Sequence, residues 1–418
     1  MHKKTHLWIV NHYAGDGSSA GSSRHYLLAR ELSKLGWEVT IFASATLFKS
    51  KVSRIDDGQR FRLEKKNGVR FVWVRTTPYV GNGSGRIRSM LEFYFRVKKN
   101  SLHSELSPPD IIIGSTVHPF AALAAYRISK KFCIPFLFEI RDLWPQTLID
   151  MGKVRPYHPA AILFRKIERL LFQKARAVIT LLPGVYKYAQ RYGLPSEKII
   201  WVSNGVDISG FSTPKYPVSD RNKTLTLMYL GSHGEANGLH TLIEAMGLLN
   251  SELRDGLGQE VVLRLVGDGP LKSSLVTMAQ TFGVLNKTVY FEDPVPKTQV
   301  PEIASMADGF VIPVLNLPHL YQYGISMNKI FDYMAAGRPT IISVSSFNNP
   351  IDEANGGITI HPEDPEQMAK AIVDFSNLDP EVRSRLGRNA RKHVEDFYSY
   401  EALAKKMNDA LRESLTSS

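Results

Sequence analysis

The segment at residues 324–339 holds the densest group of side chains that could do chemistry. It reads Gly-Ile-Ser-Met-Asn-Lys-Ile-Phe-Asp-Tyr-Met-Ala-Ala-Gly-Arg-Pro. A phosphate group at the start of this expected helix would meet free backbone N–H groups, the Ser326 hydroxyl and the Lys329 ammonium. The Asp332 carboxylate, one turn later, could accept both hydroxyls of a ribose, and Asn328 adds a polar amide. The alternative is a surface ion pair between Lys329 and Asp332 on an ordinary helix.

Two further glycine turns follow strand-like runs in the same half of the chain. One is Leu230-Gly-Ser-His-Gly-Glu-Ala-Asn-Gly238 and the other is Val266-Gly-Asp-Gly-Pro270. Each turn is a weak signal alone, but both fall at strand carboxyl ends, where loops can converge on one nucleotide. Their candidate donor-binding residues are Gly231, His233, Gly267, Asp268 and Gly269.

A third glycine loop, residues 14–23, follows the first strand-like run. Gly15, Gly17 and Gly21 are spaced G-x-G-x-x-x-G, which does not match the dinucleotide fingerprint. The loop is either a tight turn or a ligand loop, and Gly15 and Gly17 are candidate donor contacts.

Three charges end another apolar run, Phe138-Glu-Ile-Arg-Asp-Leu-Trp-Pro145. Beside an aromatic residue and a proline, they suit a site for sugar hydroxyls or phosphate, with Arg141 and Asp142 as candidate catalytic residues. The alternative is structural, either an Arg141–Asp142 pair or a pair made by Glu139.

Residues 86–99 mix cations with large apolar side chains. On a helix this pattern resembles an interfacial anchor, although it also suits a helix that covers a sheet. The candidate acceptor or membrane contacts are Arg86, Arg88, Phe93, Tyr94, Phe95, Arg96, Lys98 and Lys99.

Short apolar runs alternate with helical patterns along the whole chain, which predicts doubly wound α/β domains with mostly parallel sheets. The helix in 324–339 should begin at Met327 after the N-cap Ser326 and end at Gly337. A chain of 418 residues exceeds what one core supports. We expect an N-terminal domain at 1–205, a second domain at 206–390 after a polar linker, and a helical segment at 391–418 that could return to the first domain.

Charge divides unevenly between the halves. Residues 1–203 carry 33 Lys and Arg but 14 Asp and Glu, and the remaining residues carry 19 and 26. The basic half should therefore meet nucleic acid, anionic lipid or a phosphorylated substrate, and no nucleic-acid motif supports the first. A single cysteine, Cys133, excludes an internal disulfide and a cysteine zinc cage, and no signal or membrane-spanning run is visible. We expect a cytoplasmic protein attached peripherally to the inner face of the membrane.

Together these motifs resemble the retaining glycosyltransferases of family GT4. Asn204-Gly-Val-Asp207 is similar to the segment that closes their first domain, Val266–Pro270 to their VGDGP turn, and 326–339 to their S-x-N-K core. Arg141-Asp-Leu-Trp-Pro145 is similar to the subgroup of bacterial polysaccharide transferases that includes N-acetyl-L-fucosamine transferases. The resemblance implies a GT-B fold, two Rossmann-like domains facing each other across a cleft. It implies a UDP-sugar donor and a polyprenyl-diphosphate-linked saccharide acceptor in O-antigen or capsule synthesis.

Two departures from the family pattern bear on mechanism. The first acid of the E-x7-E pair falls on Gly324, and the Arg and Lys that clamp the donor diphosphate fall on Ser232 and Asn237. Lys329, Arg141 and helix N-termini are then left to offset the diphosphate charge. No D-x-D motif supplies a metal, so we expect metal-independent chemistry. A GT-B nucleotide-sugar epimerase or a non-catalytic nucleotide-sugar scaffold is the alternative.

Overall fold

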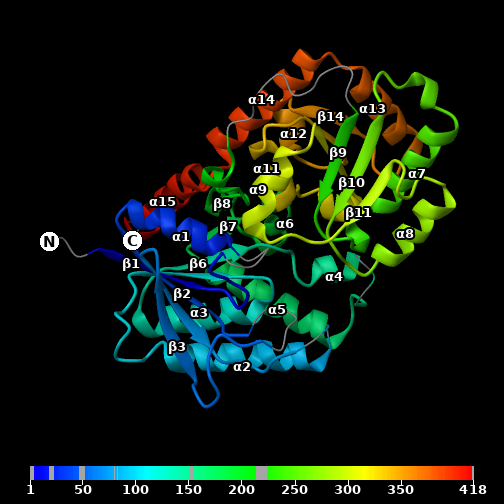
Figure 1. Ribbon diagram of the computed structural model, residues 1–418. Coiled ribbons are helices and arrows are strands. Elements are labelled where there is room, and N and C mark those ends of the chain that lie inside the picture. The colour runs from blue at the N-terminus through cyan, green and yellow to red at the C-terminus, as the bar shows by residue number, and fades with distance from the viewer. Residues whose placement is uncertain are drawn as a thin grey trace. The chain divides into compact units, whose positions relative to one another are not determined.

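The computed structural model describes residues 4–17, 23–46, 52–79, 81, 83–150, 152, 154–212 and 224–416. The chain forms two compact units, each built on its own sheet (Figure 1). Unit 1 comprises Met1–Ser203 and Tyr400–Ser418, and unit 2 comprises Asn204–Ser399. The expected α/β architecture with mostly parallel sheets is confirmed in both units.

The sheet of unit 1 has eight strands in the order β3-β4-β2-β1-β5-β6-β7-β8. Every neighbouring pair is parallel except β3 with β4. The order reverses between β1 and β5, so their carboxyl ends form the switch point at which such sheets bind ligands. The strands are β1 (Thr5–Val10), β2 (Trp37–Ser44), β3 (Phe61–Lys66), β4 (Val69–Val74), β5 (Ile111–Ser115), β6 (Phe136–Ile140), β7 (Ala177–Thr180) and β8 (Ile199–Trp201).

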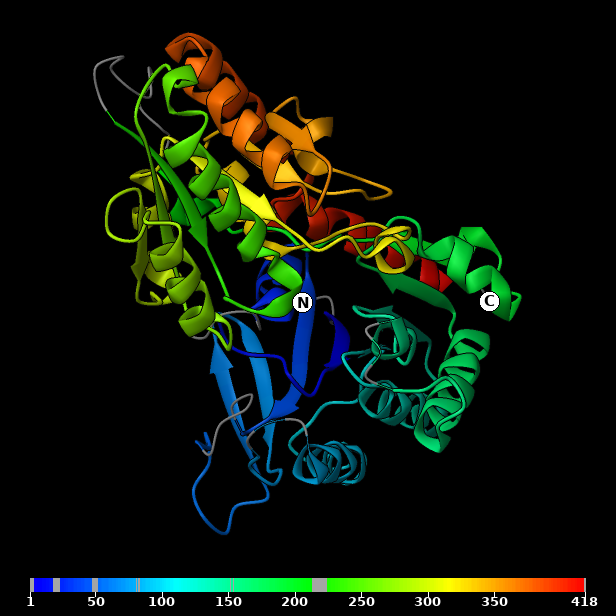
Figure 2. The same cartoon turned by 90° about the vertical axis from the view of Figure 1, so that its right-hand side faces the viewer.

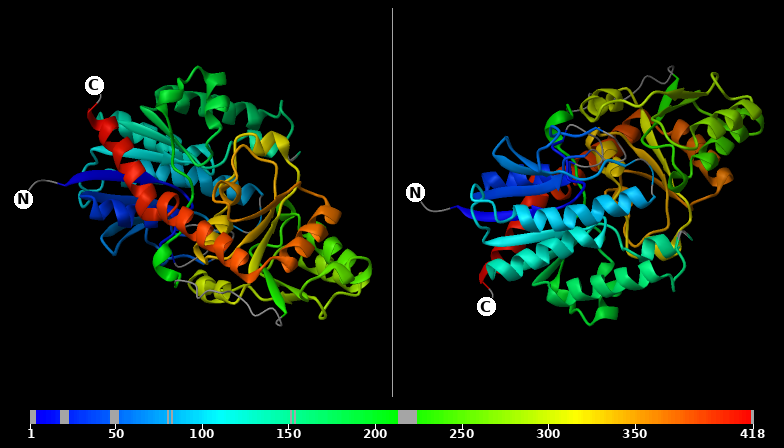
Figure 3. Two further views of the ribbon diagram at one scale, coloured as in Figure 1. Left: turned by 90° about the horizontal axis from the view of Figure 1, so that it is seen from above. Right: turned by 90° about the horizontal axis from the view of Figure 1, so that it is seen from below.

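Helices cover both faces of this sheet. On one face α2, α3 and α5 lie side by side (Figure 3, right), and on the other α1 packs against α15. Two short helices, α4 and α6, follow β6 and β7. The helices are α1 (Arg24–Lys34), α2 (Ser84–Asn100), α3 (Pro119–Phe132), α4 (Gln146–Asp150), α5 (Pro159–Lys174), α6 (Val185–Ala189) and α15 (Tyr400–Thr416).

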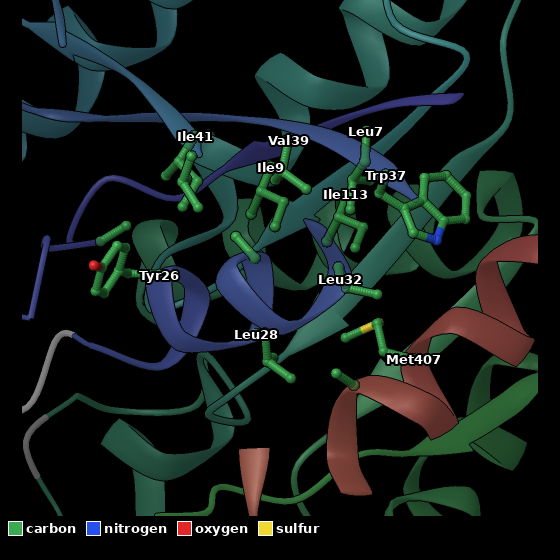
Figure 4. Close-up of a cluster of buried hydrophobic side chains, with 14 of the residues drawn as sticks. Leu7, Ile9, Tyr26, Leu28, Leu32, Trp37, Val39, Ile41, Ile113 and Met407 are labelled. Atoms are coloured by element: carbon green, nitrogen blue, oxygen red, sulfur yellow. The ribbon is translucent and has the colours of Figure 1, made fainter. Parts of the chain in front are cut away.

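The core of unit 1 between the sheet, α1 and α15 is shown in Figure 4. Leu7 and Ile9 of β1 are buried against Leu28 and Leu32, which lie one turn apart on α1. Met407 of α15 completes the cluster, with 2% of its surface exposed. The last helix of the chain is therefore a structural part of unit 1.

Strand β3 was not expected from the sequence. Its residues are mostly polar and lie at the sheet edge, paired antiparallel with β4. The two strands run together as a narrow ribbon in Figure 2. The turn between them is Asn67-Gly68, both with positive φ (46° and 84°), as a tight two-residue hairpin requires. The Asn-Gly pair was the available signal, whereas an edge strand exposed to water needs no apolar alternation.

Unit 2 has a six-stranded sheet in the order β11-β10-β9-β12-β13-β14, parallel throughout. Its order reverses between β9 and β12, which places the switch point there. The strands are β9 (Leu225–Leu230), β10 (Val261–Val266), β11 (Val289–Glu292), β12 (Gly309–Pro313), β13 (Thr340–Ser343) and β14 (Gly357–Ile360).

The helices of unit 2 alternate with these strands. α7 packs beside α13, and the two run next to each other in Figure 2. The helices are α7 (Leu239–Ser251), α8 (Lys272–Thr281), α9 (Val300–Ser305), α10 (Pro318–Tyr321), α11 (Asn328–Ala335), α12 (Pro350–Glu353), α13 (Pro365–Asn377) and α14 (Pro380–Phe397).

The C-terminal segment differs from the expected 391–418. Helix α14 runs through residue 390 and packs on α11, so it belongs to unit 2. Helix α15 begins at Tyr400 and belongs to unit 1 because Leu403, Met407 and Leu411 are buried in that core. In the part of the chain described here, no helix combines the length and apolar character needed to cross a membrane.

We expect Met407→Ala to lower the free energy of unfolding of unit 1 by about 2–5 kcal/mol, because the removed side chain leaves a cavity in the core. Urea unfolding followed by tryptophan fluorescence measures this. Lys405→Ala, on the exposed side of the same helix, should change stability by about 0.5 kcal/mol or less. Equal effects of the two substitutions would show that α15 is not anchored in the core.

Candidate functional site

The loops that follow β9 and β10 are joined by their backbones. The His233 N–H donates to the Asp268 carbonyl at 2.9 Å, and the Leu271 N–H donates to the His233 carbonyl at 3.0 Å. A Cβ at Gly267 would lie 1.9 Å from the Gly231 carbonyl oxygen. A Cβ at Gly269 would lie 2.6 Å from the backbone of His233. Glycine is therefore required where the two loops meet, and the expected convergence of these turns is present.

The same loops reach β12 across the switch point. A Cβ at Gly238, which has φ +57°, would lie 3.0 Å from the backbone of Val314, the residue after β12. Helix α11 is tied to this edge by Tyr333, whose hydroxyl accepts from the Leu230 N–H at 2.6 Å. The loops after β9 and β10 and the start of α11 thus form one edge of unit 2.

Lys329 of α11 points into this edge. Its Nζ donates to the Tyr229 hydroxyl at 2.7 Å and to Asn237 Oδ1 at 2.6 Å, and it lies 4.4 Å from the Tyr229 ring centroid. Burial lowers the pKa of Lys329 to about 7. Among the described residues no carboxylate forms an ion pair with it, so its neutral partners leave the ammonium charge without a counter-ion. The alternative of a surface ion pair between Lys329 and Asp332 is wrong.

Asp332 lies one turn along α11 and is 8% exposed. Its Oδ2 pairs with Lys297 Nζ at 2.5 Å. Burial raises the pKa of Asp332 above the ordinary aspartate value, and Lys297 opposes that rise. A buried carboxylate held by one lysine is suited to accept hydroxyl hydrogen bonds at its other oxygen.

Ser326 does not cap α11, contrary to the sequence prediction. The helix begins at Asn328, and its N-cap Met327 makes no side-chain cap hydrogen bond. Ser326 instead accepts from Asn204, through its Oγ from the backbone N–H at 2.9 Å and through its carbonyl from Nδ2 at 2.7 Å. The Asn204-Gly-Val-Asp207 segment therefore holds the loop before α11, and a tertiary contact has replaced the local cap. The Asn328 side chain is exposed.

His233 is fully buried, so its ring lies beneath the loop surface. Neither ring nitrogen has a hydrogen-bond partner among the described residues, and burial lowers the pKa of His233 below the usual histidine value. Its backbone, as shown above, connects the loops. The structure thus gives this residue a role in building the edge, and the Asp268 side chain caps its own turn by accepting from the Gly269 N–H at 2.8 Å.

Glu139, the first acid after β6, is a structural residue in unit 1. It is fully buried, with Oε2 2.5 Å from His25 Nε2 and Oε1 accepting from Arg24 Nε at 3.1 Å. Arg24 also donates to the Val202 carbonyl at 2.8 Å and to the Ser203 carbonyl. Burial favours the neutral acid, but His25 and Arg24 outweigh it and hold the pKa of Glu139 well below its ordinary value. The structural alternative is confirmed for this residue.

Arg141 and Asp142 follow on the same strand end but form no ion pair with each other among the described residues. The Arg141 N–H donates to Thr116 Oγ1 at 2.9 Å, which fixes the backbone next to β5. Its side-chain Nε is buried, and no described residue forms a hydrogen bond with it. The Asp142 side chain is exposed. Both side chains are thus available to a ligand.

Two histidines that the sequence prediction missed lie at the switch point of unit 1. His12 follows β1 and His118 follows β5, and His118 Nε2 lies 3.0 Å from His12 Nδ1. Both are buried, and burial lowers the pKa of His12 to about 3 and that of His118 well below the usual value. His118 Nδ1 has no hydrogen-bond partner in the part of the chain that the structure describes. Each histidine follows one of the two strands between which the strand order reverses. That position of a titratable residue was the sequence signal that could have predicted them.

Arg86, expected to contact acceptor or membrane, lies against this histidine site. Its Nε donates to the Tyr13 hydroxyl at 3.4 Å, and its guanidinium lies 5.6 Å from the Trp144 ring centroid.

Gly17, with φ +85°, lies in the loop after β1 in unit 1, and a Cβ there would be 3.2 Å from the Tyr26 ring. Gly15 is buried beside it. Residues 18–22 of that loop lie outside the described residues.

The rest of α2 presents a different surface from the one expected. Phe93 is fully buried, with its ring 4.6 Å from that of His12, so it cannot enter a membrane. The helical period instead leaves Ile87, Leu91 and Phe95 exposed, at 54%, 38% and 62%. We name these three residues the α2 stripe. Polar groups surround this stripe. Arg88 pairs with Glu92, Arg96 donates to the Arg75 carbonyl, and Lys98 donates to the half-buried Tyr94. Lys99 is exposed.

Comparison with known proteins assigns the chain to a family. Residues 21–205 match the family described as glycosyl transferase 4-like domain, and residues 224–377 match glycosyl transferases group 1. The chain belongs to the GT4-like, group 1 glycosyltransferases.

Within the described residues, no group of three or more His, Cys, Asp and Glu side chains could hold a metal ion.

Individual relatives are distant. The colanic acid biosynthesis glycosyltransferase named WcaL of Escherichia coli is 27% identical over 224 residues, and this match spans about half of each chain, 53% of both. D-inositol 3-phosphate glycosyltransferase of Streptomyces avermitilis is 29% identical over 402 residues, which cover 92% of this chain and 82% of that one.

Solved structures agree on the fold. Sucrose-phosphate synthase of Thermosynechococcus elongatus superposes with a TM-score of 0.76 at 17% identity, over 99% of this chain and 100% of that one. HepE of Anabaena, in complex with UDP and glucose, gives 0.66 at 13% identity, over 98% and 100%. The expected GT-B fold is confirmed. The expected N-acetyl-L-fucosamine subgroup is not tested by these matches.

We expect Glu139→Gln to destabilise unit 1 by about 3–5 kcal/mol at pH 7, because it removes one partner of a buried charge cluster. Since the pKa of Glu139 is lowered on folding, its stabilisation is present above the unfolded value of about 4.3 and is lost as the pH falls through the folded value. Urea unfolding at pH 7 and pH 4 checks this, with the exposed Glu381→Gln as control. A difference that grows toward low pH would contradict the assignment.

Proposed function

We propose that the protein transfers a sugar from a UDP-sugar to a polyprenyl-diphosphate-linked saccharide, with retention of anomeric configuration, in the assembly of a bacterial surface polysaccharide such as O-antigen or capsule. The family assignment and the name of the WcaL relative support this class of reaction. The UDP bound by HepE supports a uridine nucleotide as the probe of choice. The Arg141–Pro145 motif, which is similar to that of the bacterial polysaccharide transferases that include N-acetyl-L-fucosamine transferases, supports the same class of reaction.

The observation that carries the proposal is the edge of unit 2 around Lys329. A half-buried ammonium whose described partners are a phenol and an amide lacks the negative charge that would stabilise it. A diphosphate would supply that charge and would meet the N-terminus of α11. As the sugar leaves, charge grows on the diphosphate, and a preformed cation stabilises that state.

The ribose would bind through Asp332, and the acceptor would bind to unit 1. There the available groups are Arg141, Asp142 and the histidine site, with the basic charge of residues 1–203 favouring a phosphorylated acceptor. In a retaining transfer the acceptor hydroxyl attacks from the face that the diphosphate leaves. The departing phosphate oxygen can take the hydroxyl proton, so no strong protein base is needed.

The test is UDP release from a panel of UDP-sugars, with and without lipid-linked acceptor, followed by NMR of the product anomer. Release that requires acceptor, with a retained anomer, is the expected result. A GT-B nucleotide-sugar epimerase, favoured by the replacement of the diphosphate clamp by Ser232 and Asn237, would convert the sugar without acceptor. Repeating the assay in EDTA tests the prediction of metal independence.

We expect Lys329→Met to lower kcat by about 100-fold or more while the Kd for UDP changes less, because the ammonium acts most on the departing diphosphate. In the wild type, UDP binding should weaken as the pH rises above about 7, since the neutral amine no longer attracts the diphosphate. Comparing variant and wild type by calorimetry at each pH cancels the titration of UDP itself. Lys370→Met, on the exposed surface of α13, is the control. Unchanged kcat in Lys329→Met would refute the leaving-group role.

We propose that the protein attaches peripherally to the inner leaflet of the membrane through the α2 stripe. Attachment there would bring the enzyme to a lipid-linked acceptor. Exposed apolar residues beside arginines are suited to an interface with anionic lipid. A triple variant with Ile87→Ser, Leu91→Ser and Phe95→Ser should sediment several-fold less with phosphatidylglycerol vesicles and should bind UDP as the wild type does. Serine at Phe282 and Met306, exposed apolar residues of unit 2, is the matched control. Equal sedimentation of the α2 variant and the wild type would show that the stripe does not bind lipid.

A further inference from the structure

The ion pair between Lys297 and Asp332 joins a third loop to the proposed nucleotide site. Lys297 begins η6 (Lys297–Gln299), a single 3₁₀ turn between β11 and α9, and Asp332 lies on α11. The side chains are 33% and 11% exposed, so the lysine covers an otherwise enclosed carboxylate. The sequence prediction included Asp332 but not Lys297, because 35 residues separate them.

The contact leaves the carboxylate half engaged. Lys297 Nζ meets Oδ2 at 2.5 Å, and Oδ1 accepts no hydrogen bond from the described residues. A carboxylate has room for several donors, so Oδ1 can still accept hydroxyls. Lys297 restricts the rotation of the group while leaving one oxygen for a ligand.

Other charges near Asp332 do not substitute for Lys297. On α11 itself, Lys329 is directed to Tyr229 and Asn237. From α14, Arg391 donates to the Ala335 carbonyl. The acid of the neighbouring helix α9 is Glu302, which is exposed. The acids of α12 are Asp352 and Glu353, and Glu353 accepts a hydrogen bond from Tyr398 at 3.4 Å. Burial also raises the pKa of the adjacent Tyr333 well above its usual value, so that phenol stays neutral.

We propose that Lys297 is the positioning residue for the nucleotide ribose, holding Asp332 ionised and oriented so that Oδ1 accepts the ribose hydroxyls. This inference rests on the proposed nucleotide site of unit 2. It adds a residue outside the S-x-N-K core and explains how an enclosed aspartate serves as a hydrogen-bond acceptor. An aspartate that took up a proton would become a donor on one oxygen and would bind the diol less well.

The fold of the turn does not depend on the lysine side chain. The Gln299 N–H donates to the Pro296 carbonyl at 2.9 Å, and η6 is followed directly by α9. Lys297→Met keeps the length of the side chain and removes its charge. Lys297→Arg keeps the charge, and Lys297→Gln provides a second neutral variant in case the methionine variant does not fold.

The experiment compares binding of UDP and 2′,3′-dideoxy-UDP by calorimetry between pH 5.5 and 8.5. Wild type should prefer UDP, and Lys297→Met should lose most of that preference near pH 6 because Asp332 takes up a proton at a higher pH without the lysine. Only the ionised carboxylate binds the ribose diol well. At a pH below the pKa of Asp332, a rise of that pKa by one therefore weakens UDP binding about tenfold. The preference should return at pH 8.5 and in Lys297→Arg. Lys370→Met should behave as wild type.

The outcomes separate the inference from the function on which it rests. A wild type that binds no UDP, or binds both nucleotides equally, refutes the nucleotide or ribose assignment and the inference with it. If wild type prefers UDP and Lys297→Met keeps that preference over the whole pH range, the proposed site stands and the role of Lys297 is wrong. In the Asp332→Asn background, Lys297→Met should have no further pH-dependent effect. A full additional effect there would also overturn the inference.

Discussion

The close backbone approach of the loops after β9 and β10 is the constraint on which the unit 2 site depends. Parallel strands deliver their loops to one edge, but that edge becomes a site only if neighbouring loops can touch. Gly267 and Gly269 allow this, because any side chain there would overlap Gly231 or His233. With the loops joined, Tyr229 and Asn237 receive Lys329 from α11. A rigid backbone frame thus positions a cation at a helix N-terminus.

The two charged residues of α11 are treated differently by their surroundings. Asp332 has a lysine partner, which offsets part of the free energy of burying a carboxylate. Lys329 has neutral described partners and a lowered pKa, so it is the group that gains most from a bound anion. In unit 1 the buried Glu139 is engaged by Arg24 and His25, which makes it part of the framework, whereas Arg141 Nε has no hydrogen-bond partner among the described residues. Charge compensation therefore distinguishes structural residues from candidate ligand-binding ones.

Much of the fold could be predicted from the sequence, because buried strands such as β4 and β9 are mainly apolar runs bounded by turn residues. The failures have tertiary causes. Ser326 has the chemistry of an N-cap, but Asn204 takes its hydroxyl. Phe93 and Phe95 belong to one aromatic run, and only the packing of α2 decides that the first is buried and the second exposed. His12, His118 and Lys297 were missed because their partners are distant in sequence.

The strand-end edge of unit 2 is the proposed binding site for a nucleoside diphosphate. Hydrogen–deuterium exchange measured with and without UDP tests it most directly, because it reports where binding protects the backbone. Added protection should concentrate in residues 231–238, 267–271 and 326–332, with little change at the sheet edge formed by β3 and β4. If UDP binds but protects other segments and leaves these three unchanged, the nucleotide does not bind at this edge.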